Sequence, residues 1–166
     1  MNVIAHYDKL IDENNDPVND PKPLKEYMDK WDGRLFIDAM RLDTTKTVLE
    51  IGVGTGRLAL KTIPLCKEFF GIDISPKTID RAYYNLSQFQ NVKLVCADFM
   101  AYNFSPTFDI VYSSLTFMHI KEKQQCISKI YSLLNQGGSF VLSIDKNQNS
   151  YIDYGNRKIK IYMFPA

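Results

Sequence analysis

Three glycines alternate with other residues in the turn that follows a short apolar run at residues 48–51. They are Gly52, Gly54 and Gly56, and a helical pattern begins directly after them. Glycine allows the backbone to take a positive φ and allows a ligand to lie against bare main chain. A helix N-terminus adds free N–H groups and the positive end of its dipole. The pattern therefore predicts a strand, a tight turn and a helix start that cradle a nucleotide-type cofactor; the alternative is a glycine-rich loop that binds nothing.

Acidic residues follow two further apolar runs. Asp73 comes directly after residues 69–72, roughly 20 residues beyond the glycine turn, where an acid can hydrogen-bond ribose hydroxyls. Asp98 and Phe99 follow the run at residues 92–96. That pair suits an adenine ring, because the carboxylate can accept its exocyclic N–H and the aromatic ring can pack against its face. The plainer alternative for both acids is a solvated carboxylate in a strand-end turn.

Alternating strands and helices must position these residues. Ser75 and Pro76 predict the start of one helix, and another is expected over residues 121–134, stopped by Gly137 and Gly138. Apolar runs predict five strands, at residues 48–51, 69–72, 92–96, 108–112 and 139–144. This alternation predicts an α/β fold with a doubly wound, mostly parallel sheet that carries helices on both faces. In such a fold ligands bind at the carboxyl ends of the strands, which brings the glycine turn and the two acids together.

The 166 residues are predicted to form a single domain with three parts. Residues 1–41 are expected to form a helical cap, residues 42–145 the cofactor-binding core, and residues 146–166 a tail with one strand. Within the cap we expect a short amphipathic helix, a polar loop over residues 11–20 and a longer helix that Gly33 interrupts.

Composition argues against several kinds of partner. The chain has 45% hydrophobic and 23% charged residues and a formal net charge of +1, so it has no basic field for nucleic acid and no polybasic arm for a membrane. No apolar stretch is long enough to span a bilayer and the N-terminus lacks a signal-peptide pattern, so a cytoplasmic protein is expected. Cys66, Cys96 and Cys126 show no CxxC spacing, so no metal site is expected and each is predicted to be a buried free thiol.

Five stretches, in order and at similar spacing, resemble the class I S-adenosylmethionine-dependent methyltransferases, and the likeness runs from about Tyr7 to Asp145. In the first, Val-Leu-Glu-Ile-Gly-Val-Gly-Thr-Gly, the resemblance implies that Glu50 and the glycines hold the methionine part of the cofactor. The second, Gly-Ile-Asp-Ile-Ser, is similar to a motif that places Asp73 on the ribose and Ile74 against adenine.

The other three stretches complete the resemblance. Cys-Ala-Asp-Phe is similar to the adenine-side motif, and Phe-Asp-Ile-Val-Tyr-Ser-Ser-Leu resembles the fourth strand, whose end, here Ser113, faces the methionine moiety. Leu-Leu-Asn-Gln-Gly-Gly-Ser-Phe-Val-Leu resembles the turn into the fifth strand. The resemblance implies S-adenosylmethionine as cofactor and S-adenosylhomocysteine as product. The region of Tyr7, Asp8 and Trp31 resembles the variable cap that covers cofactor and substrate in small-molecule members.

Two other functions compete with methyl transfer. An NAD(P)-dependent oxidoreductase of the same fold carries G-x-G-x-x-G, but here the third glycine comes one residue early, at Gly56, and Arg57 follows it. An NAD(P)-dependent oxidoreductase would also leave Asp98 and Phe99 without a binding role. The remaining alternative is a non-catalytic module that binds S-adenosylmethionine without turnover.

Few side chains are expected to do chemistry, because a sulfonium is already electrophilic and the enzyme mainly aligns the nucleophile with the methyl group. A general base is needed only if the acceptor must lose a proton. Tyr7 and His119 are candidates for the substrate pocket, each with a purely structural role as the alternative, and no catalytic residue is assigned. The fourth strand ends without the Asn/Asp-Pro-Pro-aromatic run of methylases that act on nucleic-acid amines, and the charge is near neutral. A small-molecule acceptor is therefore favoured, with a protein side chain second.

Residues 146–166 decide how the edge of the sheet at the fifth strand is covered. Members of the family usually add two strands that form an antiparallel hairpin after the fifth strand, and residues 146–166 are too few for a helix plus that hairpin. Ile159, Ile161 and Met163 alternate with other residues and predict one half-buried strand. Because an open apolar edge is avoided in soluble proteins, we expect this strand to cover the fifth, or two chains to pair there as a homodimer. The chain is equally consistent with a truncated form of a longer enzyme.

Overall fold

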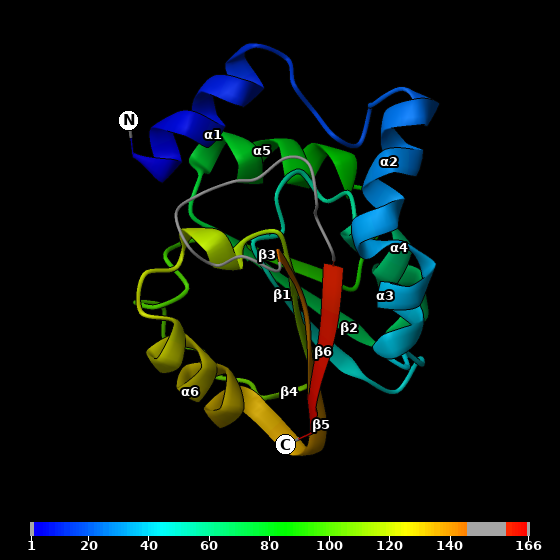
Figure 1. Ribbon diagram of the computed structural model, residues 1–166, viewed down its shortest axis with the longest axis vertical. Helices are drawn as coiled ribbons and strands as arrows, with labels where there is room; N and C mark the ends of the chain where they lie inside the picture. Colours follow the sequence, from blue (N-terminus) through cyan, green and yellow to red (C-terminus); the bar gives the residue numbers. More distant parts are fainter. Residues whose placement is uncertain (1, 146–158, 166) are drawn as a thin grey trace.

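The computed structural model describes residues 2–145 and 159–165 and contains one sheet with the strand order β3-β2-β1-β4-β5-β6 (Figure 1). Five strands run parallel: β1 (Thr47–Ile51), β2 (Glu68–Asp73), β3 (Val92–Cys96), β4 (Phe108–Ser114) and β5 (Leu134–Asp145). The order reverses between β1 and β4, where a doubly wound sheet binds its ligand. The predicted α/β fold is confirmed.

Helices cover both faces of the sheet (Figure 1). Successive side chains of a strand point to opposite faces, so Val48 packs in one core cluster and Leu49 in the other. The Val48 face is covered by α3 (Arg34–Ala39), α4 (Ala59–Thr62), the 3₁₀ turn η1 (Ile63–Leu65) and α5 (Pro76–Asn85). The Leu49 face is covered by α6 (Lys123–Leu133) and the 3₁₀ turn η2 (Phe117–His119).

The two glycines after α6 do not stop that helix, which corrects the prediction. The helix ends at Leu133, and β5 begins at Leu134, so Gly137 and Gly138 lie inside the strand. Gly137 has a φ of 77°, and the pairing register with β4 shifts between Phe108 and Ile110. The glycines therefore form an irregularity in the ladder, for which the left-handed backbone of a glycine is as useful as it is at a helix end.

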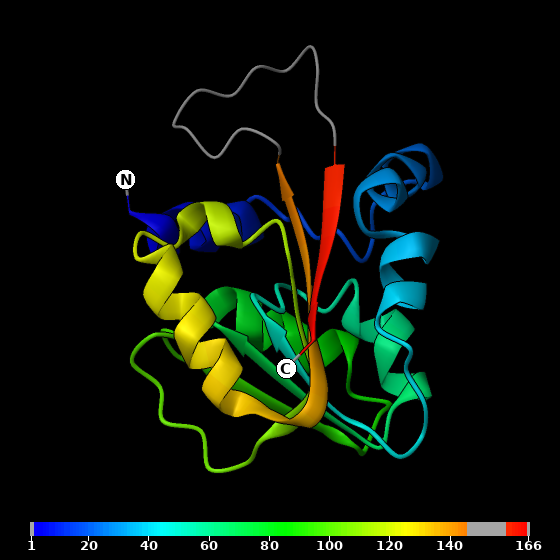
Figure 2. The same ribbon diagram turned by 60° about the horizontal axis from the view of Figure 1, so that its bottom comes forward.

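The N-terminal cap consists of α1 (Val3–Asp12), α2 (Lys22–Asp32) and α3, with Gly33 between the last two as predicted. No residue of α1 is buried, and the helix lies at the end of the sheet toward which β5 points (Figure 2). Polar contacts attach it to α5: the Ser75 hydroxyl donates to Asp8 at 2.7 Å, and Lys77 Nζ lies 2.5 Å from Asp12 Oδ1.

The last described strand, β6 (Ile159–Pro165), runs antiparallel to β5 and pairs with it from Asp145 opposite Ile159 to Ser139 opposite Pro165. The predicted covering strand is thus confirmed in its backbone, while the predicted alternation of its side chains lies outside what the structure describes. Because β6 occupies this edge of β5, the predicted dimer would have to pair elsewhere, and it stays a prediction. Across residues 2–145 and 159–165, no helix is long and apolar enough to cross a membrane.

The cysteines differ in exposure. Cys66 and Cys126 are buried free thiols as predicted, and burial raises the pKa of Cys66 to about 11 and that of Cys126 to about 12. Cys96 is exposed, so the prediction is wrong for this residue. It ends β3, the strand at one edge of the sheet, where fewer neighbours can cover it.

Candidate cofactor and active site

The three glycines of the turn after β1 all adopt a positive φ: 77° at Gly52, 57° at Gly54 and 95° at Gly56. Their surroundings differ. A Cβ on Gly52 would lie 2.0 Å from the Thr116 hydroxyl, and a Cβ on Gly56 would lie 3.0 Å from the Leu86 side chain. A Cβ on Gly54 would meet nothing within 4 Å. Gly52 and Gly54 line a cavity, whereas Gly56 is required for the packing of the turn against α5.

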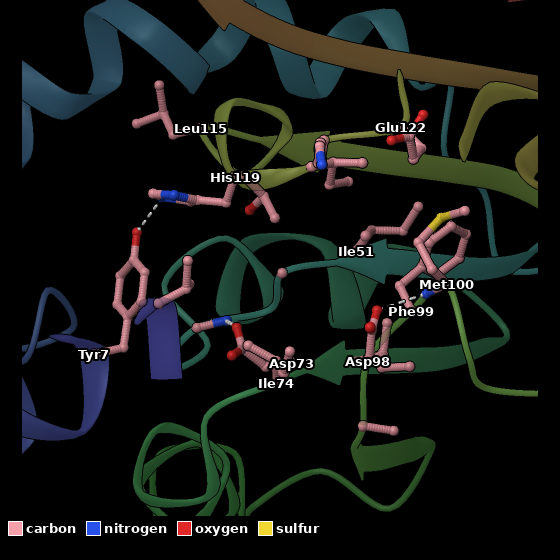
Figure 3. A pocket seen from close by; sticks show the side chains of 18 of the residues that line it. Tyr7, Ile51, Asp73, Ile74, Asp98, Phe99, Met100, Leu115, His119 and Glu122 are labelled. Atoms are coloured by element: carbon pink, nitrogen blue, oxygen red, sulfur yellow. Dashed lines mark hydrogen bonds between the residues drawn. The ribbon is translucent and has the colours of Figure 1, made fainter. Parts of the chain in front are cut away.

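That cavity has a volume of about 520 Å³ and lies at the carboxyl ends of the parallel strands (Figure 3). Its size is within the range of small-molecule and cofactor sites. One end is formed by Asp98, Phe99 and Met100, which follow β3, and the other by Tyr7 of α1 together with Leu115 and His119, which follow β4 (Figure 3).

Asp73 ends β2 and lies between these two ends of the cavity. Its Oδ2 accepts the Gly54 N–H at 3.0 Å and its Oδ1 accepts the Ser75 N–H at 3.0 Å. Burial raises the pKa of Asp73, and these backbone N–H groups oppose that effect. A carboxylate has about four lone-pair positions, so two hydrogen bonds leave capacity to accept from ribose hydroxyls. The carboxylate therefore also fixes the glycine turn, a role that the sequence does not reveal.

The end of the cavity predicted for adenine contains Ile74, Asp98 and Phe99. Asp98 Oδ1 accepts the Met100 N–H at 2.8 Å, which orients the carboxylate and leaves its second oxygen without a hydrogen bond among the described residues. The Phe99 ring is buried and packs 5.7 Å from Phe104, centroid to centroid. An acceptor oxygen beside apolar side chains fits an adenine ring, as the sequence predicts.

Tyr7 and His119 meet across the other end of the cavity, although 112 positions separate them in the chain. The Tyr7 hydroxyl lies 2.9 Å from His119 Nε2, and the rings pack edge to face with centroids 5.6 Å apart (Figure 3). Burial and the charge of Asp73 raise the pKa of Tyr7. Partial burial and His6 lower the pKa of His119. Near pH 7 the pair therefore carries no charge, and an uncharged imidazole can accept a proton.

Three of the predicted cofactor residues lie outside the cavity: Glu50, Gly56 and Ser113. Glu50 is 3% exposed and accepts the Tyr112 hydroxyl at 2.7 Å; burial raises the pKa of Glu50 well above its usual value. The Ser113 hydroxyl donates to the Ile51 carbonyl at 2.9 Å and so joins β4 to β1. Since side chains alternate along a strand, Ser114 takes the place at the cavity wall that the prediction gave to Ser113.

Sequence reasoning missed an ion pair behind this wall. Asp32, the last residue of α2, is fully buried; it accepts the Ser114 hydroxyl at 2.6 Å and the Arg57 Nη1–H at 2.9 Å. Arg57 Nη2 also donates to Asp32 Oδ2, the oxygen that accepts the Ser114 hydroxyl. The pair thereby connects the cap, the glycine turn and the cavity wall. Only an acid and an arginine 25 positions apart mark it in the sequence, and no periodic pattern links them.

A doubly wound sheet with a glycine turn after β1 and carboxylates after β2 and β3 defines a protein that binds a nucleoside-containing cofactor at the carboxyl ends of its strands. Residues 48–138, more than half of the chain, match the sequence profile of a family described as "Methyltransferase domain". The chain belongs to the class I S-adenosylmethionine-dependent methyltransferases.

Relatives and solved structures agree with this family. The chain is 31% identical over 107 residues to malonyl-[acyl-carrier protein] O-methyltransferase 1 of Ilyobacter polytropus, covering 63% of this chain and 40% of that protein. It is 31% identical over 123 residues to an uncharacterized methyltransferase of Anoxybacillus flavithermus, covering 72% and 57%. The fold is that of the N-methyltransferase NodS from Bradyrhizobium japonicum, crystallised with S-adenosylhomocysteine: TM-score 0.68, 19% identity, 86% of this chain and 73% of that one. The chain thus spans about half the length of these two sequence relatives.

Proposed function

We propose that this protein transfers the methyl group of S-adenosylmethionine to a small protic acceptor and releases S-adenosylhomocysteine. The observation that carries the proposal is that one cavity joins the glycine turn and the two strand-end carboxylates to the uncharged Tyr7–His119 pair. A cofactor cradle alone would suit a binding module, whereas a proton-accepting pair at its far end suits turnover.

The described residues fit the cofactor. The bare backbone at Gly54 suits its methionine part, Asp73 its ribose, and the apolar wall with Asp98 its adenine. Glu50 and Ser113 support this cradle from behind through hydrogen bonds to Tyr112 and to Ile51, instead of touching the ligand. When bound, S-adenosylmethionine supplies an electrophilic methyl group on a sulfonium.

Tyr7, Leu115 and His119 line the part of the cavity that remains for the acceptor. An acceptor hydroxyl or ammonium must lose a proton to attack, and the Tyr7–His119 pair takes it up at His119, whose lowered pKa leaves the imidazole unprotonated near pH 7. A cavity of about 520 Å³ that holds a cofactor leaves room only for a small acceptor. With a net charge of +1 the chain offers no field that would favour a phosphate backbone, so we propose a small molecule as partner.

The first test is binding. Titration calorimetry with S-adenosylmethionine, S-adenosylhomocysteine and NAD should show saturable binding of the first two and none of the third. Saturable binding of NAD with no heat for the other two would overturn the proposal.

The second test is turnover. The protein is incubated with methyl-labelled S-adenosylmethionine and a filtered small-molecule extract, and labelled products are identified by mass spectrometry. His119→Gln should reduce labelling at least tenfold while S-adenosylhomocysteine binds as before, because the uncharged amide cannot take up a proton. Met118→Gln, at an exposed neighbouring residue outside the cavity, is the matched control. Binding without label transfer to any fraction would favour a non-catalytic binding module.

A further inference from the structure

The adenine end of the cavity rests on residues 97–107, which connect β3 to β4 and contain neither helix nor strand. Backbone hydrogen bonds within the segment are confined to one turn, in which Ala101 and Tyr102 donate to the Asp98 carbonyl at 3.1 and 2.9 Å. Asp98 and Phe99 line the cavity from this segment. Since repetitive backbone hydrogen bonds do not fix it, side chains from elsewhere must hold the Phe99 ring in place.

Lys129, in the middle of α6, reaches this segment. Its Nζ donates to the Met100 carbonyl at 3.0 Å and to the Tyr102 carbonyl at 2.6 Å. The same ammonium lies 5.2 Å from the centroid of the Phe99 ring and 5.8 Å from that of Phe104. Charged donors make strong hydrogen bonds to carbonyls, and a cation within about 6 Å of a ring centroid is attracted to the ring face.

We propose that Lys129 is a positioning residue of the cofactor site, which holds the adenine-facing wall at Asp98 and Phe99; the inference rests on the proposed function. Lys129 does not line the cavity and acts through the carbonyls on either side of Ala101 and through the Phe99 ring. A lysine that only solubilised α6 would extend into water. The half-buried ammonium of Lys129 instead contacts two carbonyls and lies near two rings, and burial lowers its pKa.

Lys93 on β3 is a matched control within the same aromatic cluster. Its Nζ lies 5.2 Å from the Phe70 ring centroid, and Phe70 packs 5.6 Å from Phe104. No carbonyl hydrogen bond from Lys93 is found among the described residues, and neither Lys93 nor Phe70 lines the cavity. Replacing either lysine by methionine removes one cation near an aromatic ring, but only Lys129→Met frees the segment that carries Asp98 and Phe99.

The decisive measurement is discrimination between bases. Titration calorimetry compares S-adenosylhomocysteine with the analogue in which hypoxanthine replaces adenine, which has no exocyclic amine for the Asp98 carboxylate. Lys129→Met should weaken S-adenosylhomocysteine binding about tenfold, the effect of one charge-assisted hydrogen bond, and should narrow the preference for adenine. Lys129→Arg should restore most of the affinity for S-adenosylhomocysteine and most of the preference for adenine. Lys93→Met should have the affinity and the preference of the wild type. An unchanged affinity and preference in Lys129→Met would overturn the inference, as would an equal loss for both ligands.

Hydrogen exchange of the ligand-free protein separates this inference from the proposed function. Lys129→Met should speed exchange of the Met100, Ala101 and Tyr102 amides, which are hydrogen-bonded in this segment, while Lys93→Met should not. If the wild type binds no S-adenosylhomocysteine, the proposed function fails, and the exchange result still decides whether Lys129 holds the segment. Equal exchange in wild type and Lys129→Met would refute that role.

Discussion

The buried Asp32–Arg57 pair allows a quantitative test of how the cap is joined to the core. In Arg57→Met the aliphatic stem is largely kept and the guanidinium is lost. Among the residues that the structure describes, the fully buried Asp32 carboxylate then keeps the Ser114 hydroxyl as its one side-chain donor. Removing one partner of a buried pair costs about 3–5 kcal/mol, because the other charge stays buried and uncompensated. The Arg57 side chain is 16% exposed, so water can partly replace it and the lower limit, about 3 kcal/mol, is expected.

Urea denaturation followed by far-UV circular dichroism measures this loss. Trp31 is the only tryptophan of the chain, is buried and precedes Asp32, so its fluorescence reports on the same region. The matched control is Arg34→Met, which breaks the Arg34–Asp38 pair, where the side chains are 93% and 61% exposed. Such exposed pairs contribute little, so the free energy of unfolding should change by less than about 0.5 kcal/mol.

The double variant Asp32→Leu with Arg57→Met removes both charges together. It should recover most of the stability that Arg57→Met loses, because no unpaired charge remains buried. A coupling energy of about 2 kcal/mol or more between the two sites is expected from the double-mutant cycle. If Arg57→Met unfolds within about 0.5 kcal/mol of the wild type, the pair does not hold the cap and the reasoning fails.

Two further predictions address the cavity. Gly54→Val should abolish S-adenosylhomocysteine binding in calorimetry, because the new side chain would occupy the cavity space beside the turn and would be strained at a backbone φ of 57°. The circular dichroism spectrum should stay native. Normal binding would show that this turn is not the cradle. The value of kcat/KM, which reports on the free enzyme, should rise with pH through the pKa of His119, which lies below the usual 6.5, and should level off by about pH 7 as the imidazole becomes neutral. An acid limb centred above pH 6.5, or one that persists in His119→Gln, would contradict this assignment.

The cofactor end of the site was predictable because it follows from the ends of strands. Parallel strands bring their carboxyl ends to one edge of the sheet, so the glycine turn, Asp73 and Asp98 could be placed in one cavity from their positions along the chain. The choice between Ser113 and Ser114 was not predictable. Both faces of β4 are buried, so no alternation of polar and apolar residues indicates which of the two serines points to the cavity.

Long-range polar contacts could also not be predicted from the sequence. Lys129 looks like any charged residue on a helix, and its partners are main-chain carbonyls, which leave no mark in the residue types. The prediction that Gly137 ends the helix was wrong for a different reason. A glycine with a positive φ is used both at helix ends and at irregularities in a strand ladder, so the residue type alone does not distinguish the two.

The two ends of the cavity are attached to the protein in different ways. The cofactor end is built on β1, β2 and β3, whose side chains fill both cores, whereas Tyr7 is carried by α1, which buries no residue. Asp8 and Asp12 hold that helix to the start of α5 by contacts with Ser75 and Lys77, and exposed ionic contacts weaken as salt screens them. An element with few buried contacts opens at a lower free energy than the sheet does. We therefore expect the Tyr7 end of the cavity to open while the turn around Asp73 stays formed, so a cofactor bound at that turn would not require the Tyr7 end to be closed.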